Sequence, residues 1–330
     1  MFIHTATTAC RSLALAVLAM AGFACSAQTQ TAASWPTRPV RIVVGFAPGG
    51  GTDVMARNMS QALSEALGQP VIVDNKPGAS GNIAVSEVAR AAPDGHTFLI
   101  APTSVETANP SLFKSNILPA RDLTPVGSVG RMQMYLVAKP QIAAKNVREL
   151  VALAKAKPDT LSYASSGPGT APHLACELFK QATGTAITHI PYRGSSPALQ
   201  DVLSGQADFV CDPGIAFPHI RAGKVKLLGV VSAKRSPFFP DVPTVSEQGF
   251  PGANLDIWFG MWAPVGTPPD IVARMNREVG KALAQPTVKE HYGNLGAEAV
   301  GMDTAAFRKL LAEETLQLST LIKEQKISVD

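Results

Sequence analysis

Short apolar runs alternate with longer amphipathic stretches from Pro39 to the end of the chain. Each run is short enough to form a buried strand, and the stretches between them are long enough for helices. This alternation predicts an α/β protein in which crossover helices join parallel strands. The predicted strands are Val40 to Phe46, Pro70 to Asp74, His96 to Ala101, Leu161 to Ala164, Ile187 to Pro191, Ala207 to Cys211 and Val225 to Val231.

The helices are predicted from apolar residues at helical spacing behind a capping residue. A capping-box-like pair, Asn146 with Glu149, precedes Val147 to Lys157. The other predicted starts are Thr52 or Asp53, Thr170, Ser196-Pro197, Thr267-Pro268, and Asp303 or Thr304 at the head of a long terminal helix.

The length of the chain suggests two domains, because 330 residues exceed the roughly 100 to 200 of a usual domain. No internal period of a solenoid or propeller is visible. We expect crossings between two lobes at Leu136 to Pro140 and at Val225 to Val231. The expected first lobe comprises residues 28–134 and 235–330, with residues 135–234 inserted as the second lobe.

The first 27 residues read as a secretory signal peptide, with Arg11 before the apolar run Ser12 to Ala24 and small residues around Cys25. A lipoprotein signal acylated at Cys25 is the competing interpretation, but Gly22 replaces the usual leucine. We therefore expect an exported, periplasmic protein. No later stretch reaches the roughly 20 apolar residues of a membrane-spanning helix.

The composition narrows the class of protein. The 46% of hydrophobic residues exclude a disordered chain. Lysine and arginine number 29 and aspartate and glutamate 25, a net charge of +4. The charges are scattered along the sequence, which argues against a nucleic-acid partner.

Two cysteines remain after the leader, Cys176 on a predicted helix and Cys211 at a predicted strand end. Neither has a close-spaced cysteine or histidine partner of zinc type, so no metal site is expected. We expect two small buried thiols, and a disulfide between them stays open because sequence spacing gives no distance.

The loops that follow five of the strands share one chemistry. They are rich in glycine, small hydroxyls and amides, and contain few cations, Lys76 and Arg193 being the exceptions. Ligands of open α/β sheets bind at the carboxyl ends of strands, where glycine lets backbone amides and helix N-termini approach an oxyanion. The loops therefore predict a site for a small carboxylate, held by hydrogen bonds.

The candidate ligand-binding residues lie in or beside these loops. They are Phe46, Pro48, Gly49, Gly50, Thr52, Asp53, Gly78, Ala79, Ser80, Thr103, Ser104, Ser165, Gly167, Gly169, Thr170, His173, Arg193, Gly194, Ser195 and Asp212.

Three of these candidates carry alternatives. His173 falls in the first turn behind Thr170, where it either faces the ligand or is a satisfied structural histidine. Asp212 follows a strand and either accepts a hydrogen bond from the ligand or caps a turn. Phe46, together with Tyr192, either forms a wall for the apolar side of the ligand or simply packs.

The motifs considered for catalysis and for cofactor binding are incomplete in this sequence. The glycines near residues 49–51 and 167–169 do not complete G-x-G-x-x-G, and no phosphate-loop lysine follows them, so no cofactor is expected. Gly78 to Asn82 misses G-x-S-x-G by its last residue. A secreted hydrolase with Ser80 as nucleophile is kept as the alternative from another class.

Several longer motifs are spread through the chain after the leader. They are W-P-x-R-P-V-R-I-V-V (Trp35 to Val44), F-A-P-G-G-G-T-D (Phe46 to Asp53), V-D-N-K-P-G-A-S-G-N (Val73 to Asn82), P-D-G-H-T (Pro93 to Thr97), Y-A-S-S-G-P-G-T (Tyr163 to Thr170), H-I-P-Y-R-G (His189 to Gly194), A-K-R-S-P (Ala233 to Pro237), D-V-P-T-V-S-E-Q-G (Asp241 to Gly249) and A-P-V-G-T-P (Ala263 to Pro268). Together they resemble the periplasmic solute-binding proteins of tripartite tricarboxylate transporters, the Bug family.

This resemblance implies a two-lobe, type II periplasmic-binding fold that closes over a small organic acid and delivers it to integral-membrane transporter subunits. It implies a monomer without catalytic activity, whose ligand is a di- or tricarboxylate, an amino acid or an aromatic acid. The loops matching Phe46 to Asp53, Gly78 to Gly81, Thr103-Ser104 and Ser165 to Thr170 would hold one carboxylate. Residues Arg193 to Ser195 and Asp212 would lie near the other end of the ligand.

The sequence departs from the family at Cys176 and at Cys211-Asp212-Pro213, which leaves the identity of the ligand open. A ligand-sensing component of a signalling system shares the implied fold, although no output domain is visible in the chain.

Overall fold

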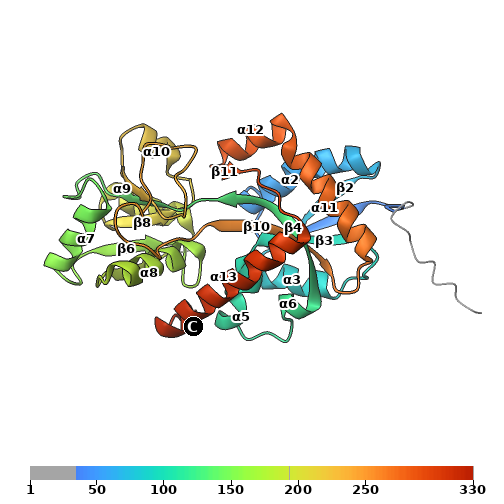
Figure 1. The fold of residues 1–330 in the computed structure, drawn as a ribbon, viewed down its shortest axis with the longest axis horizontal. Coiled ribbons are helices and arrows are strands. Elements are labelled where there is room, and N and C mark those ends of the chain that lie inside the picture. The colour runs from blue at the N-terminus through green and yellow to red at the C-terminus, as the bar shows by residue number, and fades with distance from the viewer. Residues whose placement is uncertain (1–34, 193, 330) are drawn as a thin grey trace, which may run out of the picture.

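Two mixed β-sheets, each with helices on both faces, organise the chain in a computed structural model that describes residues 35–192 and 194–329 (Figure 1). The predicted signal peptide and Cys25 lie outside the described residues, as does Arg193. In Figure 1 the two sheets form separate bodies, and strands β4 and β10 run from one body toward the other.

The first sheet has the strand order β11-β4-β10-β3-β1-β2. Its strands are β1 (Val40–Val44), β2 (Val71–Asn75), β3 (Thr97–Pro102), β4 (Leu123–Met132), β10 (Ile257–Pro264) and β11 (Ala297–Glu298). Strands β1, β2 and β3 are parallel, whereas β10 is antiparallel to both β3 and β4.

Alternate residues of β1 show how this sheet buries both faces. Ile42 packs in one cluster with α2 (Gly51–Leu67) and α11 (Pro269–Ala284), beside which α12 (Pro286–Asn294) lies. Val43 packs in another with α3 (Asn82–Ala89) and α13 (Thr304–Glu324). Short helices η1 (Ala79–Gly81), α4 (Ser104–Thr107), α5 (Asn109–Leu112) and α6 (Pro119–Asp122) fill the connections.

The second sheet has the order β7-β6-β8-β5-β9. Its strands are β5 (Tyr135–Ala138), β6 (Ser162–Ser165), β7 (Thr188–Pro191), β8 (Phe209–Asp212) and β9 (Lys226–Val230). Helices α7 (Val147–Ala156) and α8 (Ala171–Thr183) cover one face, and α9 (Ser195–Ser204) and α10 (Phe217–Arg221) cover the other.

All seven predicted strands are present, with ends shifted by at most two residues. The predicted parallel pairing is present between β1 and its neighbours β2 and β3 and between β6 and its neighbours β7 and β8. Both sheets are nevertheless mixed, because β10 in the first sheet and β5 in the second run antiparallel to their neighbours. Strands β4, β5, β10 and β11 were not predicted. Pro125, Gly127 and Gly130 interrupt the apolar pattern of β4, so its ten residues do not read as one strand.

The predicted helix caps are confirmed in two helices. The Asn146 side chain accepts from the Glu149 N–H at the start of α7, and Asp303 accepts from the Ala306 N–H at the start of α13. Helix α9 begins at Ser195, one residue before the predicted cap, because Gly194 takes the N-cap position.

The predicted positions of the crossings are wrong. Strand β5 lies between β8 and β9 inside the second sheet, so the outward crossing occurs before it, at residues 133–134. The return follows β9, through residues 231–256. Part of this return packs on the second sheet, where Phe239 meets Tyr135 edge-on and Val245 is buried. We therefore propose to move the second lobe boundary from residue 235 to about residue 256.

Helix α13 runs from one body to the other beside these crossings (Figure 1). Its first half buries Phe307 and Leu311 against the first sheet. Its second half buries Leu318, Leu321 and Ile322 in a cluster of the second sheet. The C-terminal helix is thus a third link between the two sheets.

The two cysteines form a disulfide, so the expectation of two free thiols is wrong. Cys176 on α8 and Cys211 on β8 have Cα atoms 5.9 Å apart, within the usual range for a disulfide. The helix packs directly on the strand, a proximity that the sequence separation of 35 residues does not reveal. The bridge fixes α8 to its sheet next to the loop that precedes the helix.

Candidate functional site

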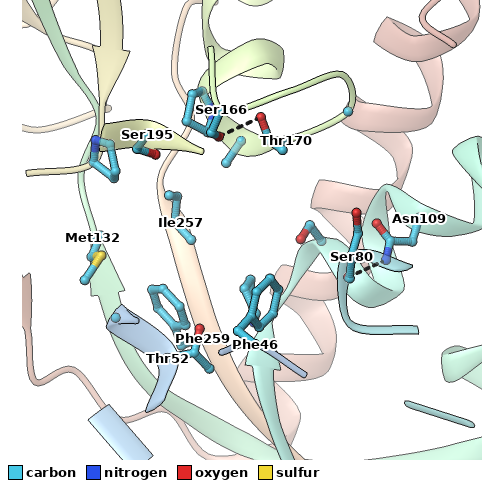
Figure 2. Close-up of a pocket in the computed structure, with 17 residues that line it drawn as sticks. Phe46, Thr52, Ser80, Asn109, Met132, Ser166, Thr170, Ser195, Ile257 and Phe259 are labelled. Carbon is cyan, nitrogen blue, oxygen red and sulfur yellow. Dashed lines mark hydrogen bonds between the residues drawn. The ribbon is translucent and has the colours of Figure 1, made fainter. Parts of the chain in front are cut away.

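A cavity of about 270 Å³ lies between the two sheets (Figure 2). The first sheet and its loops contribute Phe46, Gly51, Thr52, Ser80, Pro102, Ser104, Asn109, Met132, Ile257 and Phe259, and the second contributes Ser166, Gly169, Thr170, Ala171, Pro172, Ser195 and Pro213. The strand-end loops of both sheets therefore meet at one cavity.

The lining of the cavity is uncharged among the described residues. Hydroxyl and amide side chains face it from both sides, including Ser80 and Asn109 on one side and Thr170 on the other. Apolar side chains of Phe46 and Phe259 lie between them. A ligand bound in this cavity would contact both neutral hydrogen-bonding groups and an apolar surface.

Three helices begin at this cavity without a side-chain cap. The N-cap residues are Gly50 for α2, Thr170 for α8 and Gly194 for α9, and none makes a capping hydrogen bond with its side chain. The first residues of these helices, Gly51, Ala171 and Ser195, line the cavity. Uncapped N-termini combine free N–H donors with the positive end of the helix dipole, so their convergence favours an anion.

The loop before α2 is held by Asp53, which is almost fully buried. Its carboxylate accepts from the Gly49 N–H at 2.9 Å, from Asn75 Nδ2 at 2.8 Å and from Arg57 Nε at 3.0 Å. Burial raises the pKa of this carboxyl, but the donors outweigh burial and the net pKa is lowered. Asp53 is thus an ionised brace of the loop and does not line the cavity.

The turn from Gly78 to Gly81 holds an unusual backbone. Ala79 and Ser80 have φ values of 48° and 52°, in the left-handed region that costs a non-glycine residue about 1 kcal/mol or more. Asn109 on α5 stabilises the turn, because its Nδ2 donates to the Ser80 carbonyl and to Asn82 Oδ1, both at 3.0 Å. The brace places Ser80 at the cavity.

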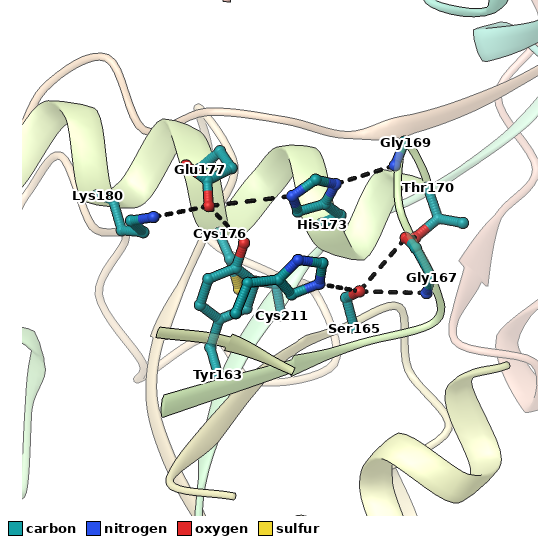
Figure 3. A network of polar contacts seen from close by, with 11 residues as sticks. Tyr163, Ser165, Gly167, Gly169, Thr170, His173, Cys176, Glu177, Lys180 and Cys211 are labelled. Carbon is teal, nitrogen blue, oxygen red and sulfur yellow. Dashed lines mark hydrogen bonds and ion pairs between the residues drawn. A yellow bond between two sulfur atoms is a disulfide. The ribbon is translucent and has the colours of Figure 1, made fainter. Parts of the chain in front are cut away.

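The loop from Ser165 to Thr170 is held by side chains beneath it (Figure 3). Thr170 Oγ1 donates to the Gly167 carbonyl at 2.7 Å, and Ser165 Oγ accepts from the Gly167 N–H at 3.1 Å. The Gly169 N–H donates to His173 Nδ1 at 2.9 Å. His173 is therefore a support of the loop and, like Asp53, does not line the cavity.

Gly169 is also where the two bodies meet. Its φ of 73° suits glycine, and a Cβ there would lie 2.7 Å from Leu112 Cδ1 of the first body. Because glycine has no Cβ, the loop can pack directly against Leu112 of α5 at the edge of the cavity.

Asp212 is buried at the end of β8. Its Oδ1 accepts from the Gly214 N–H at 2.7 Å and the Ala216 N–H at 2.9 Å, which is the turn role that the sequence left open. Burial raises its pKa to about 6, and the two N–H donors offset part of that shift. The cavity is lined by the next residue, Pro213.

Seven of the twenty candidate residues line the cavity: Phe46, Thr52, Ser80, Ser104, Gly169, Thr170 and Ser195. Twelve others lie in the supporting turns or beside the cavity: Pro48, Gly49, Gly50, Asp53, Gly78, Ala79, Thr103, Ser165, Gly167, His173, Gly194 and Asp212. Tyr192 is not among the lining residues, and its hydroxyl donates to Asp201.

Ten of the lining residues are not among the candidates. Six of them lie in or directly beside the predicted loops: Gly51, Pro102, Ser166, Ala171, Pro172 and Pro213. Sequence reasoning missed the other four altogether, namely Asn109, Met132, Ile257 and Phe259. Three of these four lie on β4 and β10, which were not predicted. Asn109-Pro110 is a helix-start signal that could have identified the fourth, because proline at the second position begins α5.

Among the described residues, Ser80 Oγ makes no hydrogen bond to a histidine or carboxylate, and no group of three metal-ligating side chains is found. No helix within residues 35–192 and 194–329 is long and apolar enough to span a bilayer.

This chain is similar to known proteins in both sequence and structure. The profile of the family described as "Tripartite tricarboxylate transporter family receptor" matches residues 55–327. Protein BugT of Bordetella pertussis is 38% identical over 93% of this chain and 94% of its own length.

Two solved structures from Rhodopseudomonas palustris are similar over almost their whole length. Rpa4515, solved with adipate, has a TM-score of 0.78 and 36% identity and covers 89% of this chain and 99% of its own. MatC, solved with bound malate, has a TM-score of 0.74 and 35% identity and covers 87% of this chain and 100% of its own.

Proposed function

Because this chain belongs to the tripartite tricarboxylate transporter receptor family, we propose that it is a periplasmic receptor that captures a small organic carboxylate. The carboxylate is bound between the two sheets and delivered to the membrane subunits of such a transporter. The observation that carries the proposal is the convergence of three uncapped helix N-termini, those of α2, α8 and α9, on one uncharged cavity.

The cavity suits the two parts of an organic acid. A carboxylate oxygen needs donors when it leaves water, and the free N–H groups of Gly51, Ala171 and Ser195 and the hydroxyl of Ser80 are such donors. The carbon skeleton would lie against Phe46, Phe259 and neighbouring apolar side chains. The adipate and malate in the two similar structures belong to this chemical class.

Capture follows from donors on facing bodies. A ligand that accepts hydrogen bonds from α2 on one side and from α8 and α9 on the other binds the closed arrangement better than an open one. The difference between the binding free energies of the ligand for the closed and the open arrangement is the free energy available for closure. No step of this process requires a bond in the ligand to break, so we propose a receptor without catalytic activity.

A thermal-shift panel on protein stripped of endogenous ligand tests the proposal. The panel contains adipate, malate, succinate, citrate, glutamate and benzoate at pH 7. A ligand present at 100 times its Kd stabilises the folded state by about 2.7 kcal/mol, which raises the melting temperature by several degrees. No shift with any acid would contradict carboxylate capture.

The hydrolase alternative has its own test. Turnover of an ester that disappears in Ser80→Ala would favour it, whereas background hydrolysis unchanged by Ser80→Ala would remove it. Co-purification distinguishes delivery from sensing. Membrane subunits of a transporter that co-purify with the chain favour delivery, whereas a co-purifying sensor protein favours sensing.

A further inference from the structure

Two stacked imidazoles lie beneath the loop Ser165–Thr170, outside the cavity that the loop lines. The rings of His173 on α8 and His189 on β7 are parallel within 9°, with centroids 4.1 Å apart. The Tyr163 ring on β6 is also nearly parallel to His189, with centroids 4.8 Å apart, and lies 6.3 Å from the His173 ring. The three rings form one aromatic cluster between the helix and the sheet.

Each imidazole is bonded to the loop. His173 Nδ1 accepts from the Gly169 N–H at 2.9 Å. His189 Nε2 and Ser165 Oγ share a hydrogen bond of 2.7 Å, and the same oxygen accepts from the Gly167 N–H. The two histidines thus fix both ends of the loop whose Ser166, Gly169 and Thr170 line the cavity.

The bond from Gly169 requires one protonation state. An imidazole nitrogen accepts a hydrogen bond only when it carries no proton, so Nδ1 of His173 is bare and its proton is on Nε2. Protonation of Nδ1 would turn it into a donor that faces another donor. The Gly169 N–H would then lose its acceptor, and the loop would have to move.

The charged and titratable groups around His173 come from three elements. Glu177 Oε1 on α8 lies 4.0 Å from His173 Nε2, but Lys180 and the Tyr163 hydroxyl also bind this carboxylate oxygen (Figure 3). His189 faces His173 from β7. A cation on His173 would thus meet a carboxylate that already has two partners and a second imidazole.

We propose that His173 is a positioning residue whose neutral imidazole holds the loop Ser165–Thr170 in its ligand-binding shape, so that acidification releases the ligand. This inference rests on the proposed function, because it concerns regulation of the same cavity.

The electrostatics support this proposal. Burial and, to a smaller extent, the positive charges of protonated His189 and of Lys180 together lower the pKa of His173 to about 4, although the Glu177 carboxylate opposes this shift. Burial also lowers the pKa of His189. The two imidazoles are therefore neutral at pH 7 and become charged only in acid.

The test compares two substitutions that differ in one acceptor. In His173→Asn the side-chain Oδ1 takes the place of Nδ1 and does not titrate, whereas in His173→Gln the carbonyl is displaced toward the position of Nε2. Adipate affinity is measured by calorimetry from pH 7 to pH 4 for the wild type and both variants. The protonation of adipate affects all three proteins equally, so the ratio of their affinities isolates residue 173.

We expect His173→Asn to bind adipate within about threefold of the wild type at pH 7, and His173→Gln to bind about tenfold more weakly. Between pH 7 and pH 4 the wild type should lose about twofold relative to His173→Asn, because about half of the His173 side chains are protonated at a pH equal to their pKa of about 4. A parallel decline of the wild type and His173→Asn would overturn the proposal, as would equal affinities of the two variants at pH 7.

A second readout needs no ligand. In the ligand-free protein, nuclear magnetic resonance should show the Gly169 amide titrating together with the His173 ring nitrogens, and a Gly169 amide independent of pH in His173→Asn. If no acid of the thermal-shift panel binds, the proposed ligand class is at fault and this readout decides the role of His173. A Gly169 amide that does not follow the ring in the wild type contradicts the role.

Discussion

The loops before α2 and before α8 are each held to the following helix by a hydrogen bond to a side chain, but the two side chains differ in chemistry. In each, the third residue of the helix accepts from the backbone N–H four residues earlier at 2.9 Å: Asp53 from Gly49, and His173 from Gly169. In each, the N-cap residue makes no side-chain cap bond, and the first turn lines the cavity. One brace is an ionised carboxylate and the other a neutral imidazole.

The difference lies in what each brace does to the helix end. Asp53 places a negative charge near the N-terminus of α2, and Arg57 pairs with it. His173 leaves the positive end of the α8 dipole without a counter-charge in its first turn. The loop of the first sheet is thus held over a wide range of pH, whereas that of the second depends on a proton that binds in acid.

The largest expected effect comes from removing the carboxylate brace. Asp53→Ala leaves the Gly49 N–H without its acceptor and Arg57 without its ion pair, and the Asn75 amide keeps only the Phe46 carbonyl as acceptor. We expect a loss of about 3 to 4 kcal/mol in the free energy of unfolding, measured by urea denaturation. Asp53→Asn keeps one acceptor oxygen and should lose about half as much. Equal losses would show that the loop does not depend on this acceptor.

The pH dependence of stability distinguishes the two braces. The pKa of His173 is 6.5 in the unfolded chain and about 4 when folded, so the unfolded state binds more protons between these values. Stability from this group is complete above pH 6.5 and lost as the pH falls through about 4, at most about 3 kcal/mol.

The contribution of Asp53 has the same direction but a lower range. The folded pKa of this carboxyl is lowered, so its stability is complete above the usual pKa of 3.8 and lost only below it. Other groups titrate too, such as Asp212, so the measured quantity is the difference in unfolding free energy between the wild type and His173→Asn. A difference that does not change from pH 7 to pH 4 would contradict the comparison.

A third loop offers a brace that does not titrate. Asn109 holds the turn at Ser80 from another helix, through an amide that stays neutral at every pH used. We expect Asn109→Ala to weaken ligand binding by about tenfold at both pH 7 and pH 5, because the left-handed turn loses its support. The exposed Asn116→Ala is the matched control and should bind as the wild type does. If calorimetry shows the same ligand affinity for Asn109→Ala as for the wild type, the support that Asn109 gives the turn does not contribute to binding.

The smallest expected effect tests the hydroxyl at the start of α8. Thr170→Val keeps the shape of the side chain but loses the bond from Oγ1 to the Gly167 carbonyl. We expect a loss of about 1 kcal/mol in unfolding free energy and a few-fold weaker binding, from denaturation and calorimetry. A loss as large as that of Asp53→Ala would mean that the hydroxyl, and not His173, carries the support of this loop.

Sequence patterns predicted the strands and the glycine loops because each buried strand is short and a glycine-rich turn follows it. They missed β4 and β10 because proline and glycine break the pattern of the former and no local signal shows that distant segments pair. The cavity-facing side chains of these strands, such as Phe259, were missed for the same reason. The disulfide also depends on the packing of a helix on its sheet, which spacing does not encode.

Asp53 and His173 show a subtler limit. Both were candidate ligand-binding residues beside a glycine loop, although Asp53 was also a predicted helix start and a structural role for His173 was left open. A residue at this position can point into the cavity or back to the loop amide, and the sequence is the same in the two cases. Only the three-dimensional arrangement shows that these side chains support the loops from behind.

Calorimetric titration of the stripped protein with matched acids and amides tests the central claim most directly. Adipate, succinate and benzoate are compared at pH 7 with adipamide, succinamide and benzamide, which have similar shapes but no charge. The account predicts that at least one acid binds with a stoichiometry of one and at least 100-fold more tightly than its amide. Equal binding of acid and amide, or no binding of any acid, would contradict an oxyanion site built from helix N-termini.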